Sequence, residues 1–121
     1  MSKSYKDIAT ETANHLGKLQ KDMPQVIQGF HGLVGAAGKA GALDEKTKEL
    51  IALALGVAAR CDGCLAFHAQ ALVKLGATRA EVEEMLGVCI YMGGGPSMMY
   101  AASALAAYEE FGGQAATATA I

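Results

Sequence analysis

Residues 50–59 read Leu-Ile-Ala-Leu-Ala-Leu-Gly-Val-Ala-Ala, a run of ten positions without a polar side chain. This run is about half of the roughly 20 residues that a membrane-spanning helix needs, so it indicates a helix in a protein core, and we expect no membrane partner. A helix that is apolar all round is normally buried all round. We therefore expect every face of this segment to be covered and the segment to be the central element of the fold.

Helices are predicted on both sides of this segment, because Ala, Leu, Met, Glu and Lys predominate and no alternating β-branched run occurs. Asp44 can cap the central helix, and Thr78 with Glu81 forms a capping box for a later one. The chain is thus predicted to be a single, compact all-α domain, 1–121, of about six helices with a frayed tail. The second of the expected helices begins at residue 24 and fades within the glycine-spaced stretch 29–41. The other expected helices cover residues 4–19, 44–59, 64–75, 78–92 and 97–111, and the expected tail is 112–121.

Composition and charge limit the classes of function. Apolar residues make up 52% of the chain and charged residues 18%, which is more apolar surface than a compact monomer readily hides, so we expect a homo-oligomer. A net charge of -2 without a basic cluster argues against nucleic acid as a partner. Residues 1–11 are polar and contain no apolar core of a secretory signal, which predicts a cytoplasmic protein in a reducing compartment.

The segment Cys61-Asp-Gly-Cys64-Leu-Ala-Phe-His68 holds the residues best suited to chemistry. A thiol must ionise before it attacks a peroxide or a disulfide, and both a helix N-terminus and a neighbouring histidine favour the thiolate. Cys61 and Cys64 lie at or just before the start of a predicted helix, and His68 follows Cys64 by one helical turn. In a reducing compartment such a close pair is more often catalytic or metal-binding than structural.

Glu49 is a candidate fourth member of this cluster. On one straight helix it would stand roughly 18 Å from Cys61, so a contact requires the chain to reverse near residues 60–63. After such a reversal the two helices run antiparallel, and Glu49 comes closer to His68 than to either cysteine. We therefore expect a proton relay in the order Glu49, His68, Cys64, in which the carboxylate fixes the imidazole tautomer and stabilises its protonated form.

A resemblance to a known family rests on these residues. The spacing Glu49, eleven residues, Cys61-x-x-Cys64-x-x-x-His68 resembles the signature of the AhpD-like alkylhydroperoxidases within the carboxymuconolactone decarboxylase superfamily. The sequence Gly-Gly-Pro-Ser at 94–97, followed by an alanine-rich helix, is similar to the C-terminal part of the same superfamily.

The resemblance spans residues 43–111 and implies an all-helical fold that assembles into trimers or hexamers. It also implies a peroxidase or disulfide-reductase activity without a metal or an organic cofactor. The substrate would be a hydroperoxide or a disulfide, and the electron donor a dithiol or a protein thiol. The resemblance assigns Cys64 as the peroxide-reactive thiol and Cys61 as the resolving one, whereas the helix dipole alone equally favours Cys61.

The residues between the two cysteines differ from the family pattern. Longer bacterial alkylhydroperoxidases carry a histidine there, where this chain has Asp62-Gly63. An acidic side chain beside the thiols raises their pKa, which predicts a slower peroxidase than the fastest members of the family.

Other interpretations of the cluster remain open. Zinc could be held by Cys61, Cys64 and His68, but a structural site needs a fourth ligand, and the remaining candidates lack motif spacing. Decarboxylation of a lactone acid, the reaction that names the superfamily, would depend on acidic and basic residues rather than on a cysteine pair. A non-catalytic redox sensor would be oxidised once without turnover. The conceivable fourth zinc ligands, which are otherwise expected to be packing or plain helix residues, are Cys89, His15 and His31.

Overall fold

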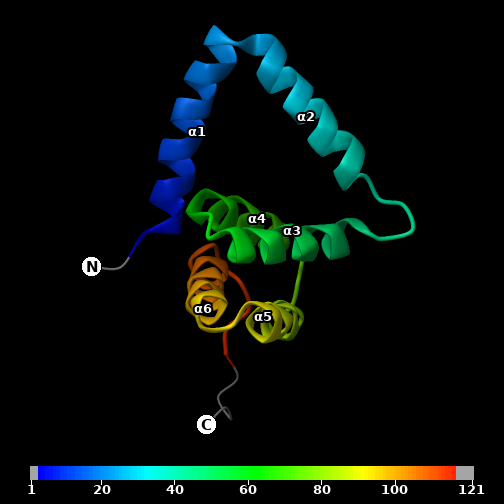
Figure 1. Ribbon diagram of the computed structural model, residues 1–121, viewed down its shortest axis with the longest axis vertical. Coiled ribbons are helices and arrows are strands. Elements are labelled where there is room, and N and C mark those ends of the chain that lie inside the picture. The colour runs from blue at the N-terminus through cyan, green and yellow to red at the C-terminus, as the bar shows by residue number, and fades with distance from the viewer. Residues whose placement is uncertain (1–2, 117–121) are drawn as a thin grey trace.

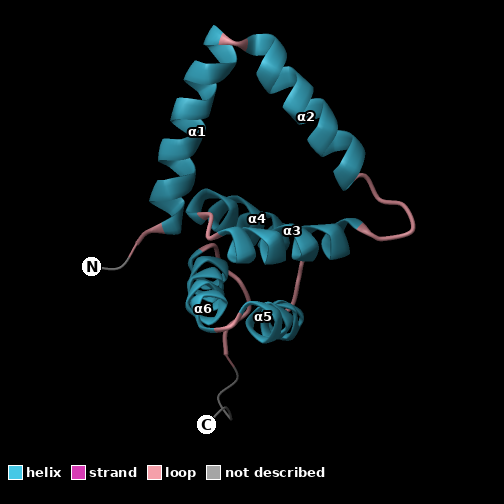
Figure 2. Cartoon of the chain, viewed as in Figure 1, coloured by secondary structure: helices cyan, strands magenta, loops and turns pink. Residues whose placement is uncertain are grey.

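The computed structural model describes residues 3–116, and these form six α-helices and no strand (Figure 2). The prediction of an all-α fold with about six helices is confirmed. None of the helices in this part of the chain is long and apolar enough to cross a membrane. The helices are α1 (Tyr5–Asp22), α2 (Pro24–Gly38), α3 (Glu45–Ala59), α4 (Asp62–Lys74), α5 (Arg79–Gly93) and α6 (Gly95–Glu110).

The core lies between α3, α4, α5 and α6 (Figure 1). Burial of one large apolar side chain stabilises a fold by about 1.5–3 kcal/mol, so the mutual packing of these four helices makes a firm scaffold. The hydroxyl of Tyr108 donates a hydrogen bond to the carbonyl oxygen of Ala77 (2.7 Å), which satisfies a polar group inside the core. The largest fully buried side chains are Leu53, Val57, Leu65, Leu72, Val82 and Tyr108.

The expectation that α3 is covered on every side is wrong for the single chain. Leu53, Gly56 and Val57 are buried, whereas Ile51 and Leu55 remain 45% and 65% exposed. The physical reason is that the helices in contact with α3 cover only part of its circumference (Figure 1). The apolar run thus leaves one side of α3 without a cover in its own chain.

Helices α1 and α2 form an arm that stands away from the core and closes a triangle with α3 (Figure 1). The first turns of α1 reach the core, where Tyr5 and Ala9 are buried, but α2 has no buried residue. The end of α2 is held by Lys48 of α3, whose ammonium group donates hydrogen bonds to the carbonyl oxygens of Ala37 (2.9 Å) and Lys39 (2.6 Å). A cation at this end of a helix is favoured by the helix dipole.

Helix boundaries in the arm differ from prediction. Helix α1 continues to Asp22 rather than ending near Leu19, because neither glycine nor proline occurs between Leu19 and Pro24. Helix α2 runs without interruption to Gly38, although its glycines predicted that it would fade from Gly29. The Lys48 hydrogen bonds that hold its last carbonyl groups offset part of the glycine cost.

Two predicted N-terminal caps are confirmed. The Asp44 carboxylate accepts a hydrogen bond from the amide of Thr47 (2.7 Å), and hydrogen bonding from Thr47 lowers the pKa of Asp44. At α5 the Thr78 hydroxyl accepts from the Glu81 amide (3.1 Å), while the Glu81 carboxylate accepts from the Thr78 amide (2.8 Å). These bonds fix where α3 and α5 begin.

Residues 113 and 114, which follow α6, are hydrogen-bonded to the core, although the frayed tail was expected to begin at residue 112. The amide of Gly113 donates to the carbonyl oxygen of Tyr108 (2.9 Å), and the amide of Gln114 donates to the Tyr108 hydroxyl (2.9 Å). The amide of Arg79 donates in turn to the side-chain oxygen of Gln114 (3.0 Å). The last part of the expected tail, 117–121, lies outside the described residues.

Glu110, the last residue of α6, holds the start of α1 on the core. Its carboxylate accepts hydrogen bonds from the amides of Tyr5 (2.7 Å) and Lys6 (3.0 Å) and from the hydroxyl of Ser4 (2.9 Å). The backbone hydrogen bonds from Lys6 and Tyr5 lower the pKa of Glu110, so folding favours the charged carboxylate. The stability that this contact contributes is therefore complete above the ordinary glutamate pKa and is lost as the pH falls through the lowered value.

Glu110→Ala is expected to lower the free energy of unfolding at neutral pH by about 1–2 kcal/mol, because three donors lose a charged acceptor. Urea unfolding followed by circular dichroism measures this loss. Glu84→Ala, which removes an exposed carboxylate from α5, is the control. On acidification the wild type should lose more stability than Glu110→Ala does. Equal urea midpoints for the two variants would contradict a role for Glu110 in holding α1.

Candidate active site

The candidate site is built on the hairpin between α3 and α4. Only Arg60 and Cys61 separate these helices, and Arg60 adopts a left-handed backbone conformation with φ of 57°. The amide of Arg60 donates a hydrogen bond to the carbonyl oxygen of Val57 (3.1 Å), and the amide of Cys61 donates one to the carbonyl oxygen of Gly56 (3.0 Å). These bonds give partners to carbonyl groups at the end of α3. The predicted chain reversal near residues 60–63 is confirmed, and it returns α4 along α3 (Figure 1).

Cys61 and Cys64 form a disulfide at the N-terminus of α4. This helix begins at Asp62, two residues earlier than predicted, so that Cys61 is its N-cap. The amide of Cys64 donates a hydrogen bond to the sulfur of Cys61 (3.2 Å). In a reduced pair, the same amide and the helix dipole would favour a thiolate at this end of α4.

His68 and Glu49 meet across the two helices. Nδ1 of His68 and Oε2 of Glu49 are 2.7 Å apart, and the two side chains are 34% and 28% exposed. When the carboxylate is ionised, Nδ1–H is the donor, which leaves Nε2 of the imidazole to exchange a proton with another group. The first contact of the expected relay, between Glu49 and His68, is therefore present in the structure.

The position of His68 relative to Cys64 follows from helix geometry. His68 lies four residues after Cys64 within α4, a spacing that puts both side chains on one face, one turn apart. A cleft of about 370 Å³ opens between α2 and α3 beside this face. It could admit an apolar substituent next to the imidazole. Its polar lining includes Glu45, Lys48, Glu49 and His68, and its apolar lining includes Val34, Ile51 and Leu55.

Asp62, which lies between the cysteines, forms an ion pair. One oxygen of its carboxylate is 2.7 Å from the ammonium group of Lys3, and this hydrogen bond raises the pKa of Lys3. The other oxygen, Oδ1, is buried and has no hydrogen-bond partner among the described residues. The positive charge of Lys3 offsets part of the electrostatic penalty that Asp62 alone would impose on the two thiols.

Gly56 permits the close approach of α3 and α4 at the cysteines, a role that was not predicted from the sequence. A β-carbon built on Gly56 would lie 2.9 Å from the β-carbon of Cys64, nearer than the roughly 3.5–4.0 Å at which carbon atoms pack. Glycine inside a helix costs about 1 kcal/mol relative to alanine. Its presence in the middle of the apolar run 50–59 was therefore the signal that could have revealed the close approach.

Gly56→Ala is expected to destabilise the fold by about 1–2 kcal/mol, because α4 must move away to accept the new methyl group. The same shift displaces Cys64, so any thiol activity should fall with stability. Gly17→Ala is the matched control, since nothing lies within 4 Å of a β-carbon at that exposed position of α1. The control should gain up to about 1 kcal/mol. Thermal unfolding of both variants decides the matter, and a stabilised Gly56→Ala would contradict the close-approach argument.

Cys89, His15 and His31 belong to other helices. Cys89 packs half-buried in α5, where its thiol lies 3.7 Å from the sulfur of Met85 and burial raises its pKa. His15 lies in α1 and His31 in α2, both exposed. Within residues 3–116 no group of three or more His, Cys, Asp or Glu side chains is arranged to hold a metal ion.

Together the fold and the site define a small all-α protein in which a Cys-x-x-Cys disulfide and a Glu–His pair meet on one helical hairpin. Residues 24–107 match the model of the carboxymuconolactone decarboxylase family, and the chain belongs to this family. An uncharacterized protein from Cupriavidus necator is 39% identical over 90% of this chain and 96% of its own length. The family resemblance inferred from the sequence is thereby confirmed.

Two solved structures resemble this fold. A carboxymuconolactone decarboxylase family protein from Legionella pneumophila, in its apo form, is 56% identical, with a TM-score of 0.89 over 91% of this chain and 98% of that one. A protein of the same family from Thermotoga maritima, for which an involvement in the antioxidative response has been suggested, is 29% identical, with a TM-score of 0.75 over 84% and 87% of the two chains. Membership places this chain in the class of the AhpD-like and decarboxylase-type enzymes.

Proposed function

We propose that this protein is a thiol oxidoreductase that reduces hydroperoxides or disulfides by cycling Cys61 and Cys64 between dithiol and disulfide. The observation that carries the proposal is the disulfide at the start of α4, one helical turn from a histidine that a carboxylate holds. Two thiols within bonding reach can give up and recover two electrons without a further cofactor. A helix N-terminus and an imidazole are the two groups that make such thiols reactive.

The first step oxidises Cys64. His68 takes the proton of the Cys64 thiol, and the Glu49 carboxylate stabilises the imidazolium that results. The thiolate attacks the distal oxygen of the hydroperoxide, so that an S–O bond forms while the O–O bond breaks. The leaving alkoxide takes the proton from His68 and departs as an alcohol. Cys64 has then lost two electrons and is a sulfenic acid.

The second step consumes this intermediate. The sulfur of Cys61 attacks the sulfur of Cys64, the disulfide forms, and the hydroxyl group leaves with the Cys61 proton as water. An external dithiol or protein thiol reduces the disulfide by exchange, is itself oxidised, and leaves both cysteines as thiols. With a disulfide as the substrate, a mixed disulfide on the attacking cysteine takes the place of the sulfenic acid.

The choice of Cys64 as the attacking thiol is supported by its position one turn before His68 on the same helix face. Cys61 has an aid of its own, because the amide of Cys64 donates to its sulfur. Its sulfur also lies within bonding reach of Cys64, so it can attack a sulfenic acid formed there. Variants of the two cysteines distinguish these roles.

The test is mass spectrometry of the reduced protein before and after one equivalent of an alkyl hydroperoxide. We expect an intramolecular disulfide between Cys61 and Cys64, with Cys89 still reduced, and we expect dihydrolipoamide to restore the dithiol over repeated cycles. One oxidation without turnover would indicate a redox sensor instead. Thiols that resist both a peroxide and a small disulfide would overturn the proposal.

A further inference from the structure

The carboxylate of Asp62 places a negative charge beside the cysteine pair. Asp62 is the first residue of α4 and directly follows Cys61, so it belongs to the same helical turn as both cysteines. One of its oxygens is 2.7 Å from the ammonium group of Lys3, and the other, Oδ1, is buried without a hydrogen-bond partner among the described residues. In the part of the chain that the structure describes, Lys3 is therefore the side chain that compensates this charge.

The backbone that carries Lys3 is held in place by the residues that follow it. Glu110, at the end of α6, accepts hydrogen bonds from three groups within residues 4–6, and the side chain of Tyr5 is buried in the core. The chain next to Lys3 cannot move away from α4 without breaking these contacts. An ion pair between two anchored segments loses less conformational freedom on forming than a typical surface pair does.

Reduction of the disulfide creates a new charge at this place. A dithiol such as dithiothreitol supplies two electrons and two protons as it closes its own disulfide. The S–S bond between Cys61 and Cys64 breaks, one proton goes to the reduced pair, and the other goes to the solvent whenever one sulfur stays a thiolate. The disulfide is neutral, whereas this reduced pair carries a negative charge in the same turn as Asp62. A nearby cation therefore favours the reduced state, and an uncompensated carboxylate disfavours it.

We propose that Lys3 is a positioning residue which, by neutralising Asp62, sets how readily the Cys61–Cys64 pair ionises and accepts electrons. This inference rests on the proposed function, because it takes the pair to be redox-active. Asp62 alone would oppose a thiolate in its own turn, and Lys3 removes most of that opposition. The contacts of Glu110 with residues 4–6 make the end of α6 part of the same arrangement.

Other titratable groups surround the cysteine pair, and each of them stays the same in every variant of the test below. A difference between these variants therefore reports the Lys3–Asp62 pair and not its surroundings. The surrounding groups are Tyr5 in α1, Glu49 in α3, Arg60 in the hairpin, His68 in α4 and Tyr100 in α6.

The first measurement is the rate at which iodoacetamide alkylates the reduced protein, with mass spectrometry to locate the label. Below the pKa of the reactive thiol, Lys3→Gln should slow labelling of Cys61 and Cys64 by about three- to tenfold, because less thiolate is present. Lys3→Arg keeps the charge and should match the wild type, whereas Asp62→Asn should speed labelling. Lys3→Gln combined with Asp62→Asn should return close to the wild-type rate, because the charge that Lys3 compensates is then absent.

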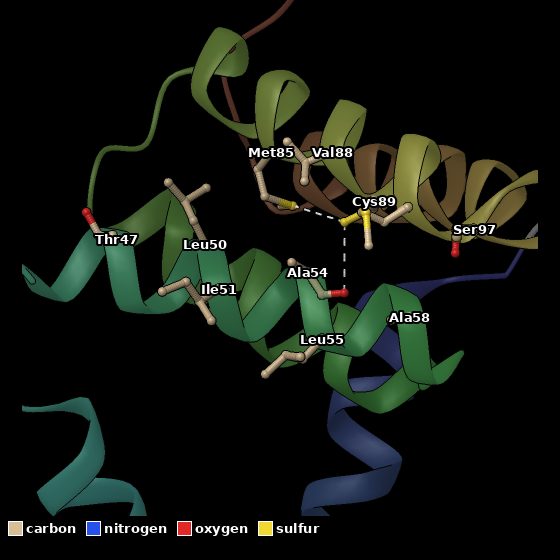
Figure 3. Close-up of a pocket in the computed structure, with 12 residues that line it drawn as sticks. Thr47, Leu50, Ile51, Ala54, Leu55, Ala58, Met85, Val88, Cys89 and Ser97 are labelled. Atoms are coloured by element: carbon tan, nitrogen blue, oxygen red, sulfur yellow. Dashed lines mark hydrogen bonds between the residues drawn. The ribbon is translucent and has the colours of Figure 1, made fainter.

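Two controls accompany this measurement. Lys18→Gln removes the same charge from the second half of α1, which stands away from the core, and should leave the rates unchanged (Figure 1). Cys89 is an internal reference, since it faces α3 across the groove between α3 and α5 (Figure 3), and its helix contacts neither α1 nor α4. Its labelling should be equal in all variants. In 1 M salt, where the Debye length is about 3 Å, the deficit of Lys3→Gln should shrink.

The second measurement is the reduction potential of the disulfide, obtained by equilibration with dithiothreitol above the pKa of the reactive thiol. A tenfold change in the equilibrium constant corresponds to about 30 mV, so Lys3→Gln should make the potential more negative by about 15–30 mV. Equal labelling rates and potentials for Lys3→Gln and the wild type would overturn the proposal, and so would a double variant that is as slow as Lys3→Gln alone. Neither measurement uses a peroxide, so a lack of peroxide or disulfide turnover would contradict the proposed function separately.

Discussion

Cys64→Ser is expected to reduce peroxide turnover to the uncatalysed background, whereas Cys61→Ser is expected to keep one stoichiometric reaction with peroxide. The reason is that Cys64 lies one helical turn before His68, the group that can take its proton. Without Cys61 the sulfenic acid on Cys64 still forms, but no thiol three residues away can convert it into a disulfide. Rapid-mixing measurements of peroxide loss, with a reagent that traps sulfenic acid, separate the two behaviours.

The two variants are matched, because each replaces one sulfur by oxygen and leaves one thiol on the same turn of the chain. If Cys61→Ser is silent and Cys64→Ser reacts once, the attacking thiol is Cys61, and the hydrogen bond from the Cys64 amide becomes the source of its reactivity. If both variants keep full turnover, the dithiol cycle is wrong. Each pattern of the two rates therefore selects one arrangement of roles.

The hairpin that carries the site could be predicted because its signals are local. The bounds of α3 and the start of α4 were predicted to within a few residues. The signals were the Asp44 cap, the uninterrupted apolar run and the short polar break that follows it. The antiparallel return of the chain then brings Glu49 to His68, which the 2.7 Å contact confirms. The ion pair between Lys3 and Asp62 could not be foreseen, since it joins residues far apart in sequence whose approach depends on how α1 packs.

The environment of the apolar segments could not be predicted from the sequence, for a different reason. Hydrophobic pattern measures how much surface must be buried, but it does not say whether the same chain or another copy buries it. Leu55 and Phe30 are of residue types that usually lie in a core, and yet they are 65% and 60% exposed in the single chain. The continuity of α2 through its glycines was missed because the hydrogen bonds from Lys48 to its last turn come from another helix.

His68→Ala is expected to slow the reaction of reduced Cys64 with peroxide by up to roughly 30-fold at neutral pH, because only about 3% of a thiol with an ordinary pKa is ionised there. Without the imidazole the thiol must ionise unaided, and an ordinary cysteine has a pKa of about 8.5. The deficit should therefore shrink as the pH rises past that value. A loss of rate that is the same at every pH would mean that His68 supports the structure and does not manage the proton.

Glu49→Gln separates the charge of the relay from its geometry. The amide can still hydrogen-bond to the His68 ring but no longer stabilises an imidazolium, so the pH at which the rate is half-maximal should move upward while the rate at high pH stays near that of the wild type. Glu45→Gln, one turn earlier on α3, is the matched control. If Glu49→Gln and Glu45→Gln have the same pH profile, the carboxylate has no electrostatic part in activating the thiol. The helix N-terminus would then be the remaining source of thiolate, which shifts the attacking role from Cys64 towards the N-cap sulfur of Cys61.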